Sequence, residues 1–98
     1  MTDLQVVAVI TAKPGSEEIV RDALTTLAGH TLGEAGCQAY ALFESEAAPG
    51  TFVTTETWLA QADLDAHLRT DHLQAALATT DGHLAAPPAI HPLRPISG

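Results

Sequence analysis

Apolar and β-branched residues recur along the chain with the two spacings that distinguish strands from helices. Residues 4–12 form a β-branched, largely apolar run that a Lys-Pro-Gly turn closes, as is typical of a buried strand. Residues 37–44 and 51–58 alternate in side-chain character, and a short loop ending in Pro-Gly joins them. The pattern predicts two further strands paired as a hairpin.

Two segments show the three-to-four-residue apolar spacing of an amphipathic helix. The first has Ser16 at the expected N-cap, and its apolar stripe predicts an end near residues 29–33. The second runs from about Gln61 to Thr79, with a bend expected near Thr70. Its apolar positions are Leu64, Leu68, Leu73, Ala76 and Leu77.

The tail contains four prolines, at positions 87, 88, 92 and 95, so it predicts an edge strand or an extended arm. The resulting order β-α-β-β-α-β predicts a single domain over residues 1–98, an α+β ferredoxin-like sandwich with two helices on one face of an antiparallel sheet. We expect the other sheet face to pair with a second copy, giving a homodimer with a barrel-like core, a dimeric α/β-barrel.

Composition supports self-association and argues against two classes of partner. Apolar residues make up 46% of the 98, which is more than a small monomer buries easily. The net charge of -8 argues against nucleic acid and anionic membranes. Cys37 is the only cysteine, and the opening residues lack the basic start of a signal peptide, so we expect a cytoplasmic protein without a disulfide.

The second helical segment carries two histidines. His67 belongs to its inward stripe, and two interpretations stay open: a core imidazole bonded to a backbone carbonyl, or a pocket histidine acting as a base or orienting a substrate. On a continuous helix His72 lies about 140° around the axis from His67. We therefore expect no shared metal unless the helix breaks between them, and predict no metal site.

The end of the third predicted strand holds further candidate residues. Trp58 is interpreted either as a packing anchor or as the wall of an aromatic-binding cavity. Glu56 lies on the same face, and if buried it needs a partner such as Arg69, Tyr40 or a histidine. Tyr40 is expected at the sheet rim or as a hydrogen-bond donor to a substrate. No motif for covalent catalysis or phosphate binding is present.

Together these residues resemble the antibiotic biosynthesis monooxygenase family over roughly residues 5–96. The elements that carry the resemblance are VVAVITAKPGSEE, Gly36-Cys37 followed by Tyr40, Glu56-x-Trp58, Leu64-x-x-His67 and His72-Leu73. The resemblance implies a ferredoxin-like fold that dimerises through its sheets, with a cavity in each subunit. Relatives in this family include oxygenases of anthrone-type polyketides, quinol monooxygenases, heme-degrading enzymes and an isomerase of a phosphorylated signalling sugar.

The chain departs from some of these relatives. It contains no asparagine, whereas the heme degraders and the anthrone oxygenase use one in the cavity. A phosphosugar isomerase needs cations, and Arg69 and Arg94 are among the few available. We therefore expect a cofactor-independent monooxygenase that oxidises a quinol, an anthrone or a polyketide-type aromatic with O2. An isomerase of a small phosphorylated metabolite and a non-catalytic small-molecule-binding dimer remain as alternatives.

The monooxygenase hypothesis assigns roles to particular side chains. His67 abstracts a proton or orients the substrate, Tyr40 and His72 provide secondary hydrogen bonds, and Glu56 holds a histidine or arginine in place. Trp58 serves as a cavity wall. The remaining predicted substrate-binding residues are Phe43, Phe52, Leu64, Arg69 and Leu73.

Overall fold

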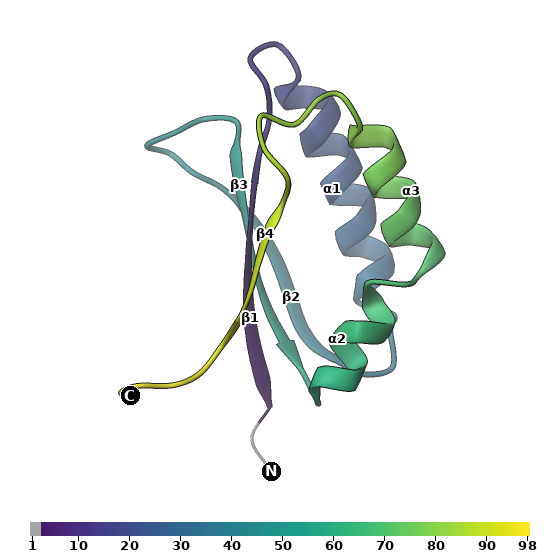
Figure 1. The fold of residues 1–98 in the computed structure, drawn as a ribbon, viewed down its shortest axis with the longest axis vertical. Helices are drawn as coiled ribbons and strands as arrows, with labels where there is room; N and C mark the ends of the chain where they lie inside the picture. Colours follow the sequence, from purple (N-terminus) through teal and green to yellow (C-terminus); the bar gives the residue numbers. More distant parts are fainter. Residues whose placement is uncertain (1–2) are drawn as a thin grey trace.

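The computed structural model describes residues 3–98 and shows an open antiparallel sheet with helices on one face (Figure 1). The elements are β1 (Leu4–Thr11), α1 (Glu17–Thr31), β2 (Cys37–Glu44), β3 (Thr51–Trp58), α2 (Gln61–His67), α3 (Asp71–Thr80) and β4 (Ala89–Leu93). The strand order is β2-β3-β1-β4, and every neighbouring pair is antiparallel. This arrangement confirms the predicted ferredoxin-like α+β fold, including the hairpin of β2 and β3.

The strands present one buried and one more open face. On β3, Phe52, Thr54, Glu56 and Trp58 are all buried, whereas the residues between them are half-buried or exposed. In β1 the buried positions alternate in the same way, and the two sets face each other in register. Because side chains alternate across a strand, one sheet face packs against the helices and the other stays uncovered.

The predicted second helix is broken into two. α2 ends at His67 and α3 begins at Asp71, so the expectation of one helix with a bend was wrong. Thr70 lies between them with an extended backbone, at φ -69° and ψ 154°. Its hydroxyl donates to the His67 carbonyl at 2.8 Å and accepts from the Leu73 amide at 3.3 Å. One side chain therefore closes α2 and caps α3.

The expected cap of α1 differs in detail. Ser16 occupies the N-cap position, but its hydroxyl makes no capping hydrogen bond and instead lies 2.9 Å from His83 Nδ1. His83 follows α3, so this contact ties the segment after α3 to the start of α1. The neighbouring ends of the two helices are thereby joined by side chains as well as by packing.

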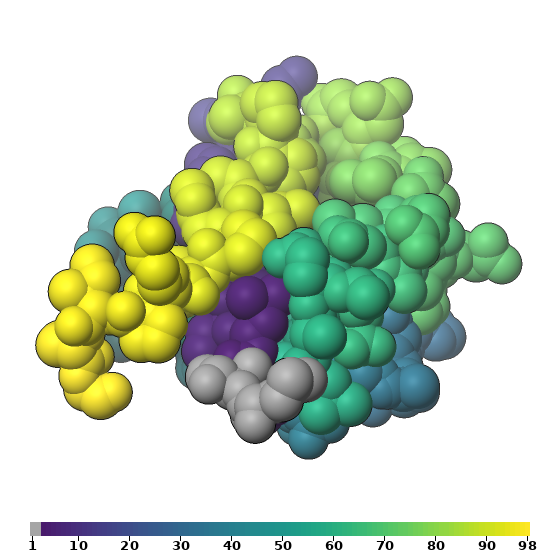
Figure 2. All heavy atoms as spheres, turned by 60° about the horizontal axis from the view of Figure 1, so that its bottom comes forward, coloured from purple at the N-terminus to yellow at the C-terminus, as the bar shows by residue number. Residues whose placement is uncertain are grey.

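The proline-rich tail forms an edge strand, which is one of the two predicted alternatives; the other was an extended arm. β4 pairs with β1 alone, in antiparallel register, and contains Pro92. In Figure 2 the yellow C-terminal segment lies over part of β1, and its last residues extend away from the rest of the molecule. Between residues 3 and 98, no helix has the length and apolar content needed to cross a membrane.

Replacing Thr70 by alanine should weaken the junction of α2 and α3. Loss of an N-cap hydroxyl costs about 1 kcal/mol of unfolding free energy, which urea denaturation would measure. Thr79→Ala, at an exposed position of α3, is the matched control and should change stability by less than about 0.5 kcal/mol. Equal stability of the parent and Thr70→Ala would contradict the capping role.

Candidate active site

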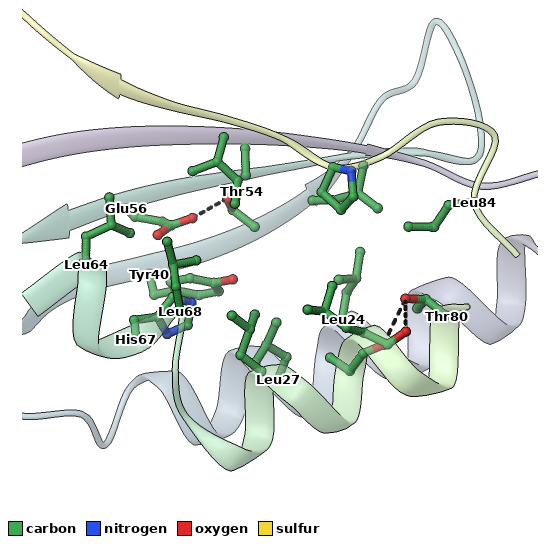
Figure 3. A pocket seen from close by; sticks show the side chains of 17 residues that line it. Leu24, Leu27, Tyr40, Thr54, Glu56, Leu64, His67, Leu68, Thr80 and Leu84 are labelled. Carbon is green, nitrogen blue, oxygen red and sulfur yellow. Dashed lines mark hydrogen bonds between the residues drawn. The ribbon is translucent and has the colours of Figure 1, made fainter. Parts of the chain in front are cut away.

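A cavity of about 320 Å³ lies between the inner face of the sheet and the helices (Figure 3). Its walls are mainly aliphatic, with leucines from α1, α2 and α3 and from the segments that follow α2 and α3. These are Leu24, Leu27, Leu64, Leu68, Leu73, Leu77 and Leu84. The polar side chains on its wall are Tyr40, Thr54, Glu56, His67 and Thr80. An apolar cavity of this size with a few polar groups suits a small organic ligand.

His67 lies at the C-terminal end of α2 and is only 3% exposed. Its Nδ1 is 2.6 Å from Glu34 Oε2. An ionised carboxylate only accepts hydrogen bonds, so Nδ1 carries a proton, and in the neutral ring Nε2 then keeps its lone pair. Within residues 3–98, every fully buried side-chain nitrogen or oxygen has a hydrogen-bond partner. His67 Nε2 has no protein partner, so this atom is not fully buried. Because His67 lines the cavity, we infer that Nε2 is open to it.

His72 meets the same carboxylate oxygen from the other side. Its Nε2 lies 2.7 Å from Glu34 Oε2, and its ring stacks on His30 with centroids 5.5 Å apart. The break at Thr70 changes the direction of the chain between the two histidines, so the angle calculated for a continuous helix does not apply. The exception allowed for in the sequence, a helix break between the two histidines, is present, and both side chains converge on Glu34.

The same three side chains are the potential metal ligands of the site. One ligand atom each from Glu34, His67 and His72 falls within 4.8 Å of the others. Ligands on one tetrahedral zinc ion, each at about 2.0–2.1 Å, stand about 3.3 Å apart. The Glu34 oxygen lies closer than that to both nitrogens, at 2.6 and 2.7 Å. The geometry is that of two charge-assisted hydrogen bonds, and binding an ion would require Glu34 to move away.

Glu56 was expected from the sequence to hold a histidine or an arginine, but its partners are two other side chains. Its Oε1 accepts from Trp58 Nε1 at 2.9 Å and its Oε2 accepts from the Thr54 hydroxyl at 2.6 Å. These three side chains follow one another on the buried face of β3, so the carboxylate is satisfied within its own strand. The carboxylate that orients His67 is Glu34, in the turn between α1 and β2. The sequence offered no periodic signal linking two residues so far apart.

Tyr40 projects from β2 opposite Glu56 of β3. Its ring centroid lies 6.0 Å from that of His67, and both rings line the cavity. Burial raises the pKa of the Tyr40 hydroxyl, and the nearby charge of Glu56 raises it further. The hydroxyl therefore stays protonated across the physiological range and is available as a hydrogen-bond donor toward the cavity.

The structure divides the other predicted site residues into three groups. Leu64 and Leu73 line the cavity. Trp58 and Phe52 are fully buried behind it, and the Trp58 ring packs 4.9 Å from that of His67, so neither forms the wall itself. Phe43 is 55% exposed on the uncovered sheet face and Arg69 is exposed on the surface, and neither lines this cavity.

Several wall residues were not predicted as site residues. Leu24 and Leu27 come from α1, and Leu84, Pro88 and Ile90 come from the tail. In the sequence, the leucines of α1 are indistinguishable from ordinary core positions, and the tail shows no apolar periodicity. Only their packing around one space identifies them, so no local pattern could have marked them.

Comparison with known proteins assigns the chain to a family. The family model described as antibiotic biosynthesis monooxygenase matches residues 4–79. The chain belongs to the antibiotic biosynthesis monooxygenase family. This confirms the resemblance seen in the sequence. A search of curated proteins found no match.

Several solved structures share this fold over almost the whole length of the chain. PA3566 from Pseudomonas aeruginosa is 29% identical, with a TM-score of 0.90, over 99% of this chain and 97% of that one. A structure described as an antibiotic biosynthesis monooxygenase is 30% identical, with a TM-score of 0.88, over 96% and 99%. Rv0793 from Mycobacterium tuberculosis is 27% identical, with a TM-score of 0.88, over 99% and 98%. The antibiotic biosynthesis monooxygenase fold thus accounts for the tail as well as the matched region.

Tyr40 is the only tyrosine of this family member, so tyrosinate absorbance reports its titration directly. We expect the folded protein to titrate well above the pH at which the unfolded chain does, about pH 10. Since the folded pKa is raised, Tyr40 contributes stability below the unfolded pKa that is lost as the pH rises above it.

Urea denaturation at increasing alkaline pH would measure this loss. Tyr40→Phe has no phenolic proton and should show a shallower decline above about pH 10. Identical titration of Tyr40 in folded and unfolded protein would contradict its enclosed position.

Proposed function

We propose that this protein is a monooxygenase that oxidises an electron-rich aromatic substrate, a quinol, an anthrone or a related polyketide, with O2 and without a cofactor. The observation that carries the proposal is His67, whose Nδ1 is held by Glu34 while its Nε2 is open to an apolar cavity. A carboxylate that fixes one ring nitrogen leaves the other as a positioned base. Membership of the antibiotic biosynthesis monooxygenase family supports oxygen chemistry at this site.

The proposed reaction balances in atoms and electrons without an external reductant. A naphthoquinol and O2 have the same atoms as a hydroxynaphthoquinone and water, since one oxygen atom enters the ring and the other leaves as water. The substrate supplies all the electrons: the quinol becomes a quinone and a ring C–H bond becomes C–OH. Loss of a phenolic proton makes the ring a better electron donor to O2, and His67 Nε2 accepts that proton in this proposal.

The rest of the cavity supports this reaction. The Tyr40 hydroxyl, kept protonated by burial, donates to a substrate oxygen, and the leucine-rich walls hold the aromatic ring and exclude water. Glu56 stays bonded to Trp58 and Thr54 and so supports the wall. His72 acts through Glu34 rather than on the substrate, since it is absent from the cavity wall.

The two alternatives differ in what the site would need. An isomerase of a phosphorylated metabolite requires cations at the phosphate, but Arg69 and Arg94 are exposed and neither is among the residues that line the cavity. A non-catalytic binding dimer would use the same cavity without turnover. Measured turnover separates it from the monooxygenase.

Oxygen uptake with a reduced naphthoquinone and with an anthrone, without added cofactor, tests the proposal. The parent should consume O2 above the rate of autoxidation. His67→Gln should lose most of that activity, by about 100-fold or more, because general base catalysis contributes about 10²–10⁴-fold. Product analysis by mass spectrometry should show one added oxygen atom.

The matched control is His83→Gln, because His83 contacts Ser16 and does not line the cavity. This variant should retain parental turnover. A folded His67→Gln protein that is as active as the parent would remove His67 from the mechanism. No uptake by the parent with either substrate class would favour the isomerase or the binding protein.

We also propose that two copies pair through the uncovered sheet face. Val7, Val9, Val53, Ala41 and Phe43 lie on that face, where Phe43 is 55% exposed. No helix of residues 3–98 packs against it (Figure 1). A largely apolar sheet face that a second copy covers would complete a two-sheet core.

Light scattering and sedimentation should give a dimer at micromolar concentration. Phe43→Asp should shift the protein toward monomer, because it places a charge in the contact. Leu32→Asp, at a residue 59% exposed near the end of α1, should leave the dimer intact. A stable parental monomer would refute the pairing.

A further inference from the structure

Glu34 Oε2 joins two histidines that lie in different environments. His67 is 3% exposed and lines the apolar cavity, whereas the His72 side chain is 23% exposed and lines a shallow groove between α1 and α3. The two ring centroids are 6.2 Å apart. The three side chains therefore form a continuous hydrogen-bonded connection from the enclosed cavity to the outer groove.

We propose that His67, Glu34 and His72 act as a coupled proton-exchange unit, in which proton uptake at His67 from the cavity is balanced by proton release from His72 to solvent. The inference rests on the proposed function, because it explains how an enclosed base disposes of charge. Glu34 and His72 are positioning residues in this scheme, since neither lines the cavity.

The charges of the unit set its preferred state. One carboxylate compensates one imidazolium, so in the proposed resting unit a single proton is held in excess of the two neutral rings and the ionised Glu34. A second imidazolium would have no counter-charge and would repel the first across 6.2 Å between ring centroids. Because both rings bond to one carboxylate oxygen, we expect them to titrate as a pair.

The proton steps balance. The proposed cycle starts with the excess proton on His72, which lies nearer to solvent, and with a neutral His67 that is protonated on Nδ1. When substrate enters, its O–H bond breaks and an N–H bond forms at His67 Nε2. Repulsion then breaks the N–H bond at His72 Nδ1, and that proton passes to water. Glu34 stays ionised throughout and accepts a hydrogen bond from each ring.

Other titratable groups surround the unit. Tyr40 and Glu56 line the cavity with His67, and Cys37 packs against the neighbouring cluster around Trp58. His30 and Asp22 line the groove with His72, and Asp71 precedes His72 in the chain. Burial raises the pKa of the Cys37 thiol and of the Tyr40 hydroxyl, so both stay neutral near pH 7. Glu56 is already bonded to Trp58 and Thr54. Glu34 is thus the carboxylate that bonds to both rings.

NMR titration of the carbon-bound ring protons tests the coupling without any substrate. In His67→Gln the titration of His72 should move to higher pH, by about one pH unit, because its competitor for the charge of Glu34 is gone. In His72→Gln the titration of His67 should move up by the same amount, since coupling between two sites is reciprocal. Glu34→Gln should move both titrations to lower pH.

Matched controls separate coupling from general disturbance. His83→Gln removes a histidine outside the unit and should leave both titrations in place, as should Glu44→Gln, which removes the carboxylate paired with Arg21. If the buried His67→Gln variant fails to fold, the reciprocal measurement in His72→Gln decides. Titrations of His72 that are superimposable with and without His67 would overturn the proposal.

Two further outcomes are distinguishable. If treatment with EDTA changes either titration, the three side chains ligate a metal ion and the proton-exchange proposal fails. If the coupling is present but neither the naphthoquinol nor the anthrone is consumed, the proton unit stands and the monooxygenase proposal fails. Turnover without coupling would leave the monooxygenase and remove the unit.

Discussion

One carboxylate oxygen organises the candidate site. Glu34 Oε2 receives hydrogen bonds at 2.6 and 2.7 Å from histidines that belong to different helices. That contact connects the turn between α1 and β2 to the end of α2 and the first turn of α3. It also sets the tautomer of a neutral His67, because a ring that donates its one N–H from Nδ1 to a carboxylate keeps its lone pair on Nε2. The chemistry proposed for the cavity depends on this assignment, and the fold serves to bring the three side chains together.

The break between α2 and α3 at Thr70 allows His67 and His72 to bond to the same Glu34 oxygen. On a continuous helix His67 and His72 would point in directions about 140° apart and could not share an acceptor. The Thr70 hydroxyl bonds to both flanking helices, so the interruption is a defined structure with its own hydrogen bonds. The backbone geometry that Thr70 fixes therefore helps to place both histidines against the Glu34 carboxylate.

Sequence patterns predicted the fold well because each helix and strand has a recognisable local pattern of apolar and polar residues. The alternation in residues 51–58 placed Glu56 and Trp58 on one buried face, and the prolines of the tail restricted β4 to an edge. The site was only partly predictable. His67, Tyr40, Glu56, Leu64 and Leu73 line the cavity, but Glu34 was missed because its partners are distant in sequence. Phe43 was proposed as a pocket residue for its aromatic ring, but it lies on the sheet face opposite to that of Tyr40 and does not line the cavity.

A base that works in an apolar cavity needs a nearby carboxylate, so the aliphatic wall of the cavity and the hydrogen bonds of Glu34 belong together. An aliphatic wall keeps water from a reduced aromatic ring, but it also penalises the imidazolium that proton abstraction creates. A carboxylate placed on the far side of the ring offsets that penalty without touching the substrate. In the proposed proton-exchange unit, sharing this carboxylate with a more exposed histidine provides a route for adjusting the charge at the surface. The proposal thereby combines an apolar substrate cavity with acid–base chemistry inside it.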